Sequence, residues 1–185
     1  MNALTIICIV WLLSEVLLNR LMRSKETDKQ NVDNRSLLLI WLTIIVSVAV
    51  AVTISITRYD PISTNPNLVY VGMGLLLVGI VLRLLVIRSM GQHFTVDVTI
   101  KKDHVLKTDG FFTYLRHPSY FASLLSFVGF GLCLNNWISL SIIVVCMLFS
   151  FIRRIQVEEA VLTEQFGQAY IDYAKHTKRL IPFIY

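Results

Sequence analysis

Long apolar runs dominate the sequence, without the regular alternation of apolar and polar positions that half-buried elements of soluble domains show. Residues 36–57 are 22 consecutive positions without a charge, and residues 118–152 are 35. At 1.5 Å per residue a helix of the second length would measure about 50 Å, whereas the hydrocarbon core of a bilayer is about 30 Å thick. We therefore predict two helices there, separated at Asn135-Asn136, the strongly turn-favouring pair within the run.

This division predicts an all-α integral membrane protein with five transmembrane helices in a single membrane domain, residues 1–185. The last two segments have 17 and 16 residues, so we expect them to form a short helical hairpin. Beyond them, apolar residues recur near the helical period over 157–173, with Gly167 as an interruption. This pattern predicts an amphipathic C-terminal helix that lies on the membrane or caps the site. The predicted spans are residues 3–19, 36–57, 68–87, 118–134 and 137–152.

The composition supports a membrane location. Apolar residues make up 55% of the chain and charged residues 16%, with a mean hydropathy of +0.66, whereas soluble domains carry about 25% charged residues. These values exclude a soluble enzyme, a disordered chain and a disulfide scaffold. The three cysteines lie in apolar segments without the spacing of a zinc site or a disulfide framework.

The basic residues predict an orientation in the bilayer. Fifteen of the 17 lysines and arginines fall within residues 20–35, 88–116 and 153–185, which share one side of the membrane if there are five spans. The positive-inside rule then places the N-terminus outside and the C-terminus in the cytoplasm. The net charge of +5 is explained by this topology and by attraction to the lipid bilayer, so no nucleic-acid partner is expected. Cofactor-site segments are expected at 88–120 and 153–185.

Two charged residues interrupt the predicted helices, Glu15 in the first and Arg83 in the third. Each lies five residues before the cytoplasmic boundary, which is marked by Arg20 and Arg88. One interpretation is that Arg83 extends toward the membrane surface and that Glu15 pairs with it or with Arg20. The alternative is that one of the two lines an active cavity.

The segment Tyr114–Tyr120 leads into the fourth predicted helix. In a structural interpretation Arg116 anchors the chain at the cytoplasmic surface and Pro118 suits the first helical turn. In a functional interpretation, a helix N-terminus flanked by Arg116 and His117 holds an anion or a polar cofactor, because its first N–H groups have no partner within the helix.

Arg154 and Glu158 follow the fifth predicted span and, being four residues apart, share one helical face. Such a pair is typical of a solvated helix face and also suits a site at the membrane surface. The histidines His93 and His104 have no carboxylate or cysteine at metal-ligand spacing, so no metal site is predicted. The sequence also lacks a P-loop, a GxGxxG motif and Ser, His and Asp residues in the order of a catalytic triad.

Two blocks of motifs lie in the second half of the chain. The first contains His104-Val105-Leu106, Gly110 and Arg116-His117-Pro118-Ser119-Tyr120, and the second contains Glu158-Glu159, Phe166-Gly167, Tyr170, Tyr173 and Leu180-Ile181-Pro182-Phe183. In this order and spacing, over roughly residues 83–185, they resemble isoprenylcysteine carboxyl methyltransferases. That family is integral to the membrane and uses S-adenosyl-L-methionine without a Rossmann fold.

The resemblance implies a cofactor site and a substrate site. Phe112 stands where the family has a cofactor-contacting tyrosine, so a hydroxyl is lost and an aromatic ring kept. Arg154 stands where the family places an arginine that faces the substrate carboxylate, and Arg116 is expected to help as a second catalytic residue. The implied cofactor-binding residues are His104, Val105, Leu106, Lys107, Phe112, His117, Pro118, Ser119, Tyr120 and Glu158.

The acceptor is less closely defined. The resemblance favours a carboxylate on a lipophilic or prenylated substrate that enters from the membrane. An amine headgroup, as in phospholipid N-methyltransferases, comes next. Membrane sterol and enone reductases share an RHPxY-like block but use NADPH, and a non-enzymatic scaffold is a further alternative. Five spans resemble compact prokaryotic members, so we expect a prokaryotic cell membrane; the oligomeric state is not predicted.

Overall fold

The computed structural model describes residues 3–21, 34–57, 59–91, 106–182 and 184–185, and it is built from helices. Across these residues no strand is present, apart from an isolated bridge between Leu115 and Lys178, so the all-α class is confirmed. In chain order the elements are α1 (Ala3–Leu21), α2 (Asn34–Ile56), α3 (Leu68–Met90), the 3-10 helix η3 (Gly110–Thr113), α4 (Pro118–Cys133), α5 (Trp137–Phe166) and α6 (Gln168–His176).

The helices have the character of a multi-pass membrane protein. By length and composition α2, α3 and α5 are long and apolar enough to cross a bilayer, and α1 and α4 contain shorter apolar stretches of 16 residues each, 3–18 and 118–133. Many of their large apolar side chains are exposed, as expected of surfaces that face lipid. The count of five crossings stays a prediction.

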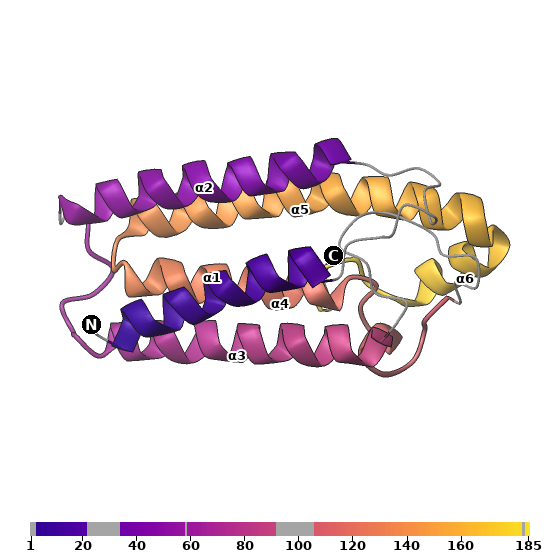
Figure 1. Ribbon diagram of the computed structural model, residues 1–185, viewed down its shortest axis with the longest axis horizontal. Coiled ribbons are helices and arrows are strands. Elements are labelled where there is room, and N and C mark those ends of the chain that lie inside the picture. The colour runs from indigo at the N-terminus through magenta and orange to yellow at the C-terminus, as the bar shows by residue number, and fades with distance from the viewer. Residues whose placement is uncertain (1–2, 22–33, 58, 92–105, 183) are drawn as a thin grey trace.

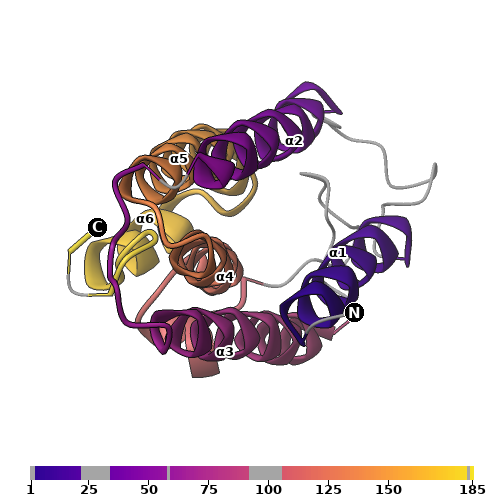
Figure 2. The ribbon, with the colours of Figure 1, turned by 90° about the vertical axis from the view of Figure 1, so that its left-hand side faces the viewer.

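The five long helices run alongside one another in alternating directions (Figure 1). The end-on view in Figure 2 shows α4 in the middle, with α3 and α5 on either side of it, α2 against α5, and α1 beside α3. The C-terminal ends of α1, α3 and α5 and the N-terminal ends of α2 and α4 lie at the end of the bundle that carries α6 (Figure 1). This arrangement brings residues 106–120 next to residues 153–182.

Glycines let α3 and α4 pack closely. A Cβ atom added at Gly129 would lie 2.4 Å from the backbone nitrogen of Leu76, and one at Gly79 would lie 2.6 Å from the backbone nitrogen of Ser126. These glycines therefore form a close-packing face between the two helices. Gly74 is not part of this face, because a Cβ there would have no neighbour within 4 Å.

The helix break predicted at Asn135-Asn136 is confirmed, since α4 ends at Cys133 and α5 begins at Trp137. The side chain of Asn136 caps α5 by accepting a hydrogen bond from the Ser139 N–H at 2.8 Å. Asn135 exchanges two hydrogen bonds with the backbone of Ser63, at 2.8 and 3.0 Å. The pair thus ends one helix, starts the next and fixes the connection between α2 and α3.

α5 is longer than predicted. It continues to Phe166, 30 residues in all, although the apolar run ends at Ile152. Gly167, with φ of 53°, ends α5 and starts α6. The prediction of a single amphipathic helix over 157–173 is therefore wrong, because residues up to Phe166 form the end of α5 and those from Gln168 belong to α6. The two helices of the predicted hairpin also differ in length, with 16 residues in α4 and 30 in α5. That this hairpin crosses the membrane stays a prediction.

Candidate functional site

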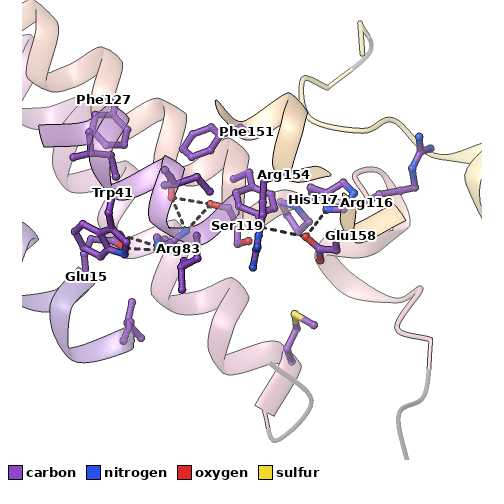
Figure 3. A pocket seen from close by; sticks show the side chains of 18 of the residues that line it. Glu15, Trp41, Arg83, Arg116, His117, Ser119, Phe127, Phe151, Arg154 and Glu158 are labelled. Carbon is purple, nitrogen blue, oxygen red and sulfur yellow. Dashed lines mark hydrogen bonds and ion pairs between the residues drawn. The ribbon is translucent and has the colours of Figure 1, made fainter. Parts of the chain in front are cut away.

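A cavity of about 550 Å³ is lined by residues from all six α-helices and from η3. Figure 3 shows Arg116, His117 and Glu158 on one side of it and Phe127 and Trp41 on the other. The cavity therefore has a polar part, near the start of α4 and the end of α5, and an apolar part between the helices.

The polar part is held together by the C-terminal segment. The N–H groups of Arg116 and His117 donate to the carbonyls of Lys178 and Arg179 at 2.8 and 3.1 Å, and the N–H of Lys178 donates to the carbonyl of Tyr114 at 3.0 Å. These bonds place the residues before α4 alongside a segment some 60 positions later in the chain. Pro118 then starts α4 at a position where its missing N–H is not needed.

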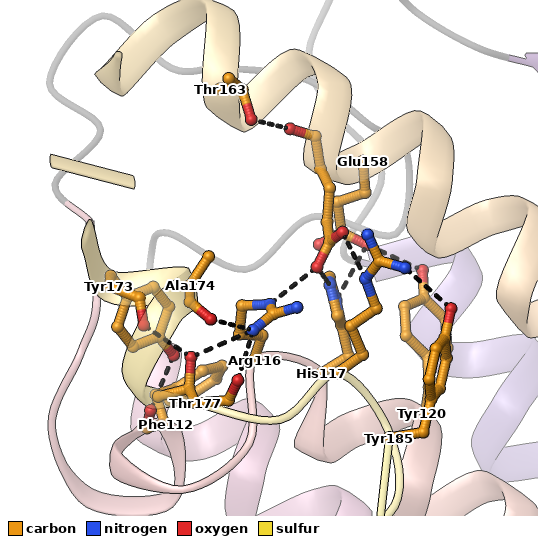
Figure 4. Close-up of polar contacts among 12 residues, drawn as sticks. Phe112, Arg116, His117, Tyr120, Glu158, Thr163, Tyr173, Ala174, Thr177 and Tyr185 are labelled. Carbon is orange, nitrogen blue, oxygen red and sulfur yellow. Dashed lines mark hydrogen bonds and ion pairs between the residues drawn. The ribbon is translucent and has the colours of Figure 1, made fainter. Parts of the chain in front are cut away.

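Glu159 is the centre of an ion-pair network, and two of its partners, Arg116 and His117, are labelled in Figure 4. Its two carboxylate oxygens lie 2.8 Å from Nε of Arg116 and 2.8 Å from Nε of Arg179, and Oε1 lies 3.5 Å from Nε2 of His117. Arg116 also donates to the carbonyls of Ala174 and Thr177. The guanidinium of Arg116 therefore binds Glu159 and the C-terminal end of α6, which suits a positioning role better than direct contact with an acceptor.

Glu158, the preceding residue, faces the cavity instead. One of its carboxylate oxygens accepts a hydrogen bond from the Tyr120 hydroxyl at 3.2 Å and lies 3.7 Å from Nδ1 of His117. The Glu158 side chain is 32% exposed, whereas Arg154, one turn earlier on α5, is 1% exposed and also lines the cavity. The structure thus brings together a carboxylate, a guanidinium and a phenol at the predicted site.

Two tyrosines of α6 complete the polar part. The Tyr173 hydroxyl donates to the Phe112 carbonyl at 2.7 Å, and burial raises its pKa to about 12, so it stays a neutral donor at physiological pH. The Tyr170 hydroxyl is buried and has no hydrogen-bond partner among the residues that the structure describes. Both tyrosines line the cavity.

Most of the predicted site residues lie together in this cavity. His104 and Val105 fall outside the described residues, as does His93. Those that line the cavity are Leu106, Lys107, Phe112, Arg116, His117, Pro118, Ser119, Tyr120, Arg154 and Glu158.

The sequence did not indicate several residues of the cavity. Trp11 of α1 and Trp41 of α2 line its apolar part together with Phe127, and the Trp11 and Phe127 rings meet edge-on with centroids 4.9 Å apart. No motif marks these positions, because only the packing of distant helices gathers them. Glu15 and Arg83 also line the cavity and pair with each other, so the predicted pairing is confirmed, whereas a role for either charge in an active site stays a prediction.

Comparisons with known proteins point to one group. The sequence model of the phospholipid methyltransferase family matches residues 68–169. The chain is 37% identical over 114 residues to the protein-S-isoprenylcysteine O-methyltransferase of Schizosaccharomyces pombe, covering 60% of this chain and 48% of that protein. It is 34% identical over 115 residues to protein-S-isoprenylcysteine O-methyltransferase B of Arabidopsis thaliana, covering 61% of this chain and 58% of that protein. The chain thus spans about half the length of these relatives, and they are eukaryotic, so a prokaryotic origin stays a prediction.

A solved structure agrees over most of the chain. The fold is similar to that of a eukaryotic intramembrane Ras methyltransferase, isoprenylcysteine carboxyl methyltransferase, with a TM-score of 0.74 and 27% identity. The match covers 96% of this chain and 64% of that chain. Because the family model covers more than half of the sequence, including α4 and most of the residues that line the polar part of the cavity, the chain belongs to the phospholipid methyltransferase family.

Proposed function

We propose that this protein is a membrane methyltransferase that moves a methyl group from S-adenosyl-L-methionine to the carboxylate of a lipophilic acceptor of the prenylcysteine type. One observation carries the proposal: a single cavity joins a polar part, with Arg154 and Glu158, to an apolar part lined by aromatic side chains. The names of the curated relatives support the same reaction.

The size of the apolar part suits a lipid tail. Phe130 lines the cavity twelve positions after Pro118 on α4, a distance of about 18 Å along the helix axis. Half of a bilayer core measures about 15 Å. A hydrocarbon chain that begins near the polar part would therefore reach roughly to the middle of the membrane while in contact with α1, α2 and α4.

The polar part fits the cofactor. Buried polar atoms are nearly always hydrogen-bonded. The buried Tyr170 hydroxyl lies near the Glu159 carboxylate but makes no well-formed hydrogen bond among the described residues, so it is placed to bind a polar ligand. Glu158 would accept hydrogen bonds from the ribose hydroxyls or the amine, and the first turn of α4 suits the cofactor carboxylate. The aromatic ring of Phe112 remains available for stacking, and roles for His104 and Val105 stay predictions.

Methyl transfer to a carboxylate requires the protein to align the two reacting groups and requires no proton transfer. When bound, the cofactor supplies an electrophilic methyl group on a sulfonium. The acceptor carboxylate provides the electron pair, the new C–O bond forms as the C–S bond breaks, and the pair of the broken bond stays on sulfur. No proton moves, so no general base is needed. The protein's contribution is to align the two groups and to exclude water.

Arg154 is the residue we propose for orienting the acceptor. It is buried at 1% exposure against the cavity, where a guanidinium binds a carboxylate through two parallel N–H donors. Lysine would keep the charge but lose this planar geometry. We propose that Arg116 acts on the acceptor only indirectly, by fixing the start of α4 through Glu159.

An amine acceptor is the second candidate, and the family match favours it, since the family is described as phospholipid methyltransferases. In that reaction a neutral amine would attack and then lose a proton, which a carboxylate beside the cavity such as Glu158 would receive. The two acceptors are distinguished by direct assay, because an O-methyl ester is cleaved by mild alkali and an N-methyl group is not.

Calorimetric binding tests the cofactor first. Purified protein in detergent micelles is titrated with S-adenosylhomocysteine, the demethylated product, and in parallel with NADPH. We expect S-adenosylhomocysteine to bind, and Glu158→Ala to lose this binding. Glu164→Ala is the matched control, because Glu164 lies exposed on the same helix, outside the cavity. Binding of NADPH alone would refute the proposal in favour of a reductase.

Methyl transfer tests the acceptor. Protein in mixed micelles receives radiolabelled S-adenosyl-L-methionine with either an N-acetylated S-farnesylcysteine or phosphatidylethanolamine. Alkali-labile label on the farnesylcysteine supports the carboxylate acceptor, whereas alkali-stable label on the phospholipid replaces it with the amine. The orientation, with the N-terminus outside and the C-terminus cytoplasmic, is tested by protease access to tags placed at the two ends.

A further inference from the structure

An ion pair between α1 and α3 lies beside the proposed site (Figure 3). Nε of Arg83 is 2.8 Å from Oε1 of Glu15, and Nη2 of Arg83 donates to Oε2 at 3.0 Å. The guanidinium therefore contacts both carboxylate oxygens, with one hydrogen bond, from Nη2, and a close ion pair at Nε. The two side chains are 15% and 23% exposed, and both lie in apolar helices, where a charge without a partner is costly.

The remaining edge of the Arg83 guanidinium binds α4. Nη1 donates to the Ser119 carbonyl at 3.2 Å and to the Ser123 hydroxyl, which in turn donates to the same carbonyl at 3.1 Å. Ser119 lies in the first turn of α4, between Pro118 and Tyr120. One cation thus ties α1 and α3 to the turn whose residues line the polar part of the cavity.

Arg83 is poorly placed to bind the acceptor itself. Two of its nitrogens are engaged by Glu15 and the third by α4, so an acceptor carboxylate would have to displace one of them. Arg154, which lies on α5 beside Tyr120 and Glu158, has the position expected of the acceptor ligand. The contacts of Arg83 therefore suit a positioning role.

We propose that Arg83 is a positioning residue for methyl transfer: it fixes the first turn of α4 through the Ser119 carbonyl, and Glu15 holds its guanidinium in place from α1. This inference rests on the proposed function, because the turn it fixes is the proposed cofactor site. A shift of about 1 Å in a positioned group lowers a reaction rate as much as about 100-fold. The pair also makes α1, which has no fully buried residue among those described, part of the support of the site.

Arg83→Lys tests the inference with charge conserved. One ammonium nitrogen keeps a pairing with Glu15 but does not reach Glu15 and the Ser119 carbonyl together. We expect the dissociation constant of S-adenosylhomocysteine to rise and kcat to fall by about tenfold each or more, with the acceptor KM unchanged. A merely destabilised variant would instead lose folded protein while the folded part binds normally. Arg88→Lys, at an exposed position of the same helix, is the matched control and should stay within twofold of the wild type.

The charge reversal Glu15→Arg with Arg83→Glu separates positioning from simple tethering. It keeps an ion pair between α1 and α3 but turns a carboxylate toward the Ser119 carbonyl, so we expect no rescue of kcat. Recovery to within twofold of the wild type would overturn the inference, and so would an Arg83→Lys enzyme that matches Arg88→Lys. Those results leave the proposed function standing. If the wild type neither binds S-adenosylhomocysteine nor methylates either acceptor, the function fails and the inference fails with it.

Discussion

Replacing Glu159 by glutamine should destabilise the protein, whereas the same change at Glu158 should impair cofactor binding and leave stability nearly unchanged. Glu159 is 11% exposed, and its two oxygens each lie 2.8 Å from an arginine Nε. Glutamine offers one carbonyl oxygen and one NH₂ group. One of the two arginines, Arg116 or Arg179, would therefore face a donor instead of an acceptor.

The magnitude follows from the burial of each partner. Arg116 is 9% exposed, so losing its charged partner should cost about 3 kcal/mol. Arg179 is 37% exposed, so its pairing should contribute only about 0.5 kcal/mol. At about 2–4 °C per kcal/mol for a chain of this size, Glu159→Gln should lower the apparent Tm by about 6–12 °C.

Glu158→Gln should have a much smaller effect on stability. Its hydrogen-bond contact is with the Tyr120 hydroxyl at 3.2 Å, and a glutamine oxygen accepts the same bond. We therefore expect Glu158→Gln to change stability by less than about 1 kcal/mol. Its loss of negative charge should weaken S-adenosylhomocysteine binding by about tenfold, since hydrogen bonds to an ionised acceptor are about twice as strong as neutral ones.

The assay is thermal unfolding in one detergent at one scan rate, combined with calorimetric titration well below the lower Tm. Glu164→Gln, at an exposed position of α5, provides the baseline. The reasoning is refuted if Glu159→Gln is as stable as this control, or if Glu158→Gln lowers the Tm as far as Glu159→Gln does.

Three further predictions concern packing, titration and the acceptor. Gly129→Ala should lower the Tm, because the added Cβ would lie 2.4 Å from the Leu76 nitrogen and such overpacking destabilises the fold by about 1–3 kcal/mol. Gly74→Ala adds a Cβ in open space and should leave the Tm unchanged. Equal effects of the two substitutions would contradict the packing argument. The pKa of Tyr173 is raised by burial to about 12, so its contribution to stability is complete below pH 10 and is lost as the pH rises toward 12. Tyr173→Phe should flatten the measured stability between these pH values. Arg154→Lys should lower kcat/KM for a carboxylate acceptor by about 100-fold while S-adenosylhomocysteine still binds, and unchanged steady-state kinetics would exclude Arg154 as the acceptor ligand.

The start of α4 could be predicted because the signals that mark it are local. Pro118 suits a helix start, the charges on either side mark a membrane boundary, and Asn135-Asn136 marks a turn. The end of α5 could not be predicted in the same way. Hydropathy falls after Ile152, but backbone hydrogen bonds continue until Gly167, the first residue whose conformation ends the helix. A change in hydropathy marks a change of environment, not the end of a helix.

The different roles of Glu158 and Glu159 also depend on geometry. Successive helical residues point about 100° apart, so Glu158 faces the cavity and Glu159 faces Arg116 and Arg179. The resemblance to a known family predicted Glu158 for the site, but the direction of each side chain depends on how α5 is rotated against α4 and the C-terminal segment.

The sequence by itself determined the membrane class and the helix break at the asparagine pair, because these depend on composition, spacing and local hydrogen bonding. Its resemblance to a known family indicated most of the polar residues of the proposed site. Only the tertiary structure decided which apolar residues line the cavity and what Glu15 and Arg83 bind. Trp11, Trp41 and Phe127 belong to three helices far apart in the chain. Apolar residues fill every face of these helices, so their pattern does not indicate which face meets lipid and which meets another helix. That choice is made by close packing, where the glycines of α3 and α4 let two backbones approach and leave α1 and α2 to enclose the cavity.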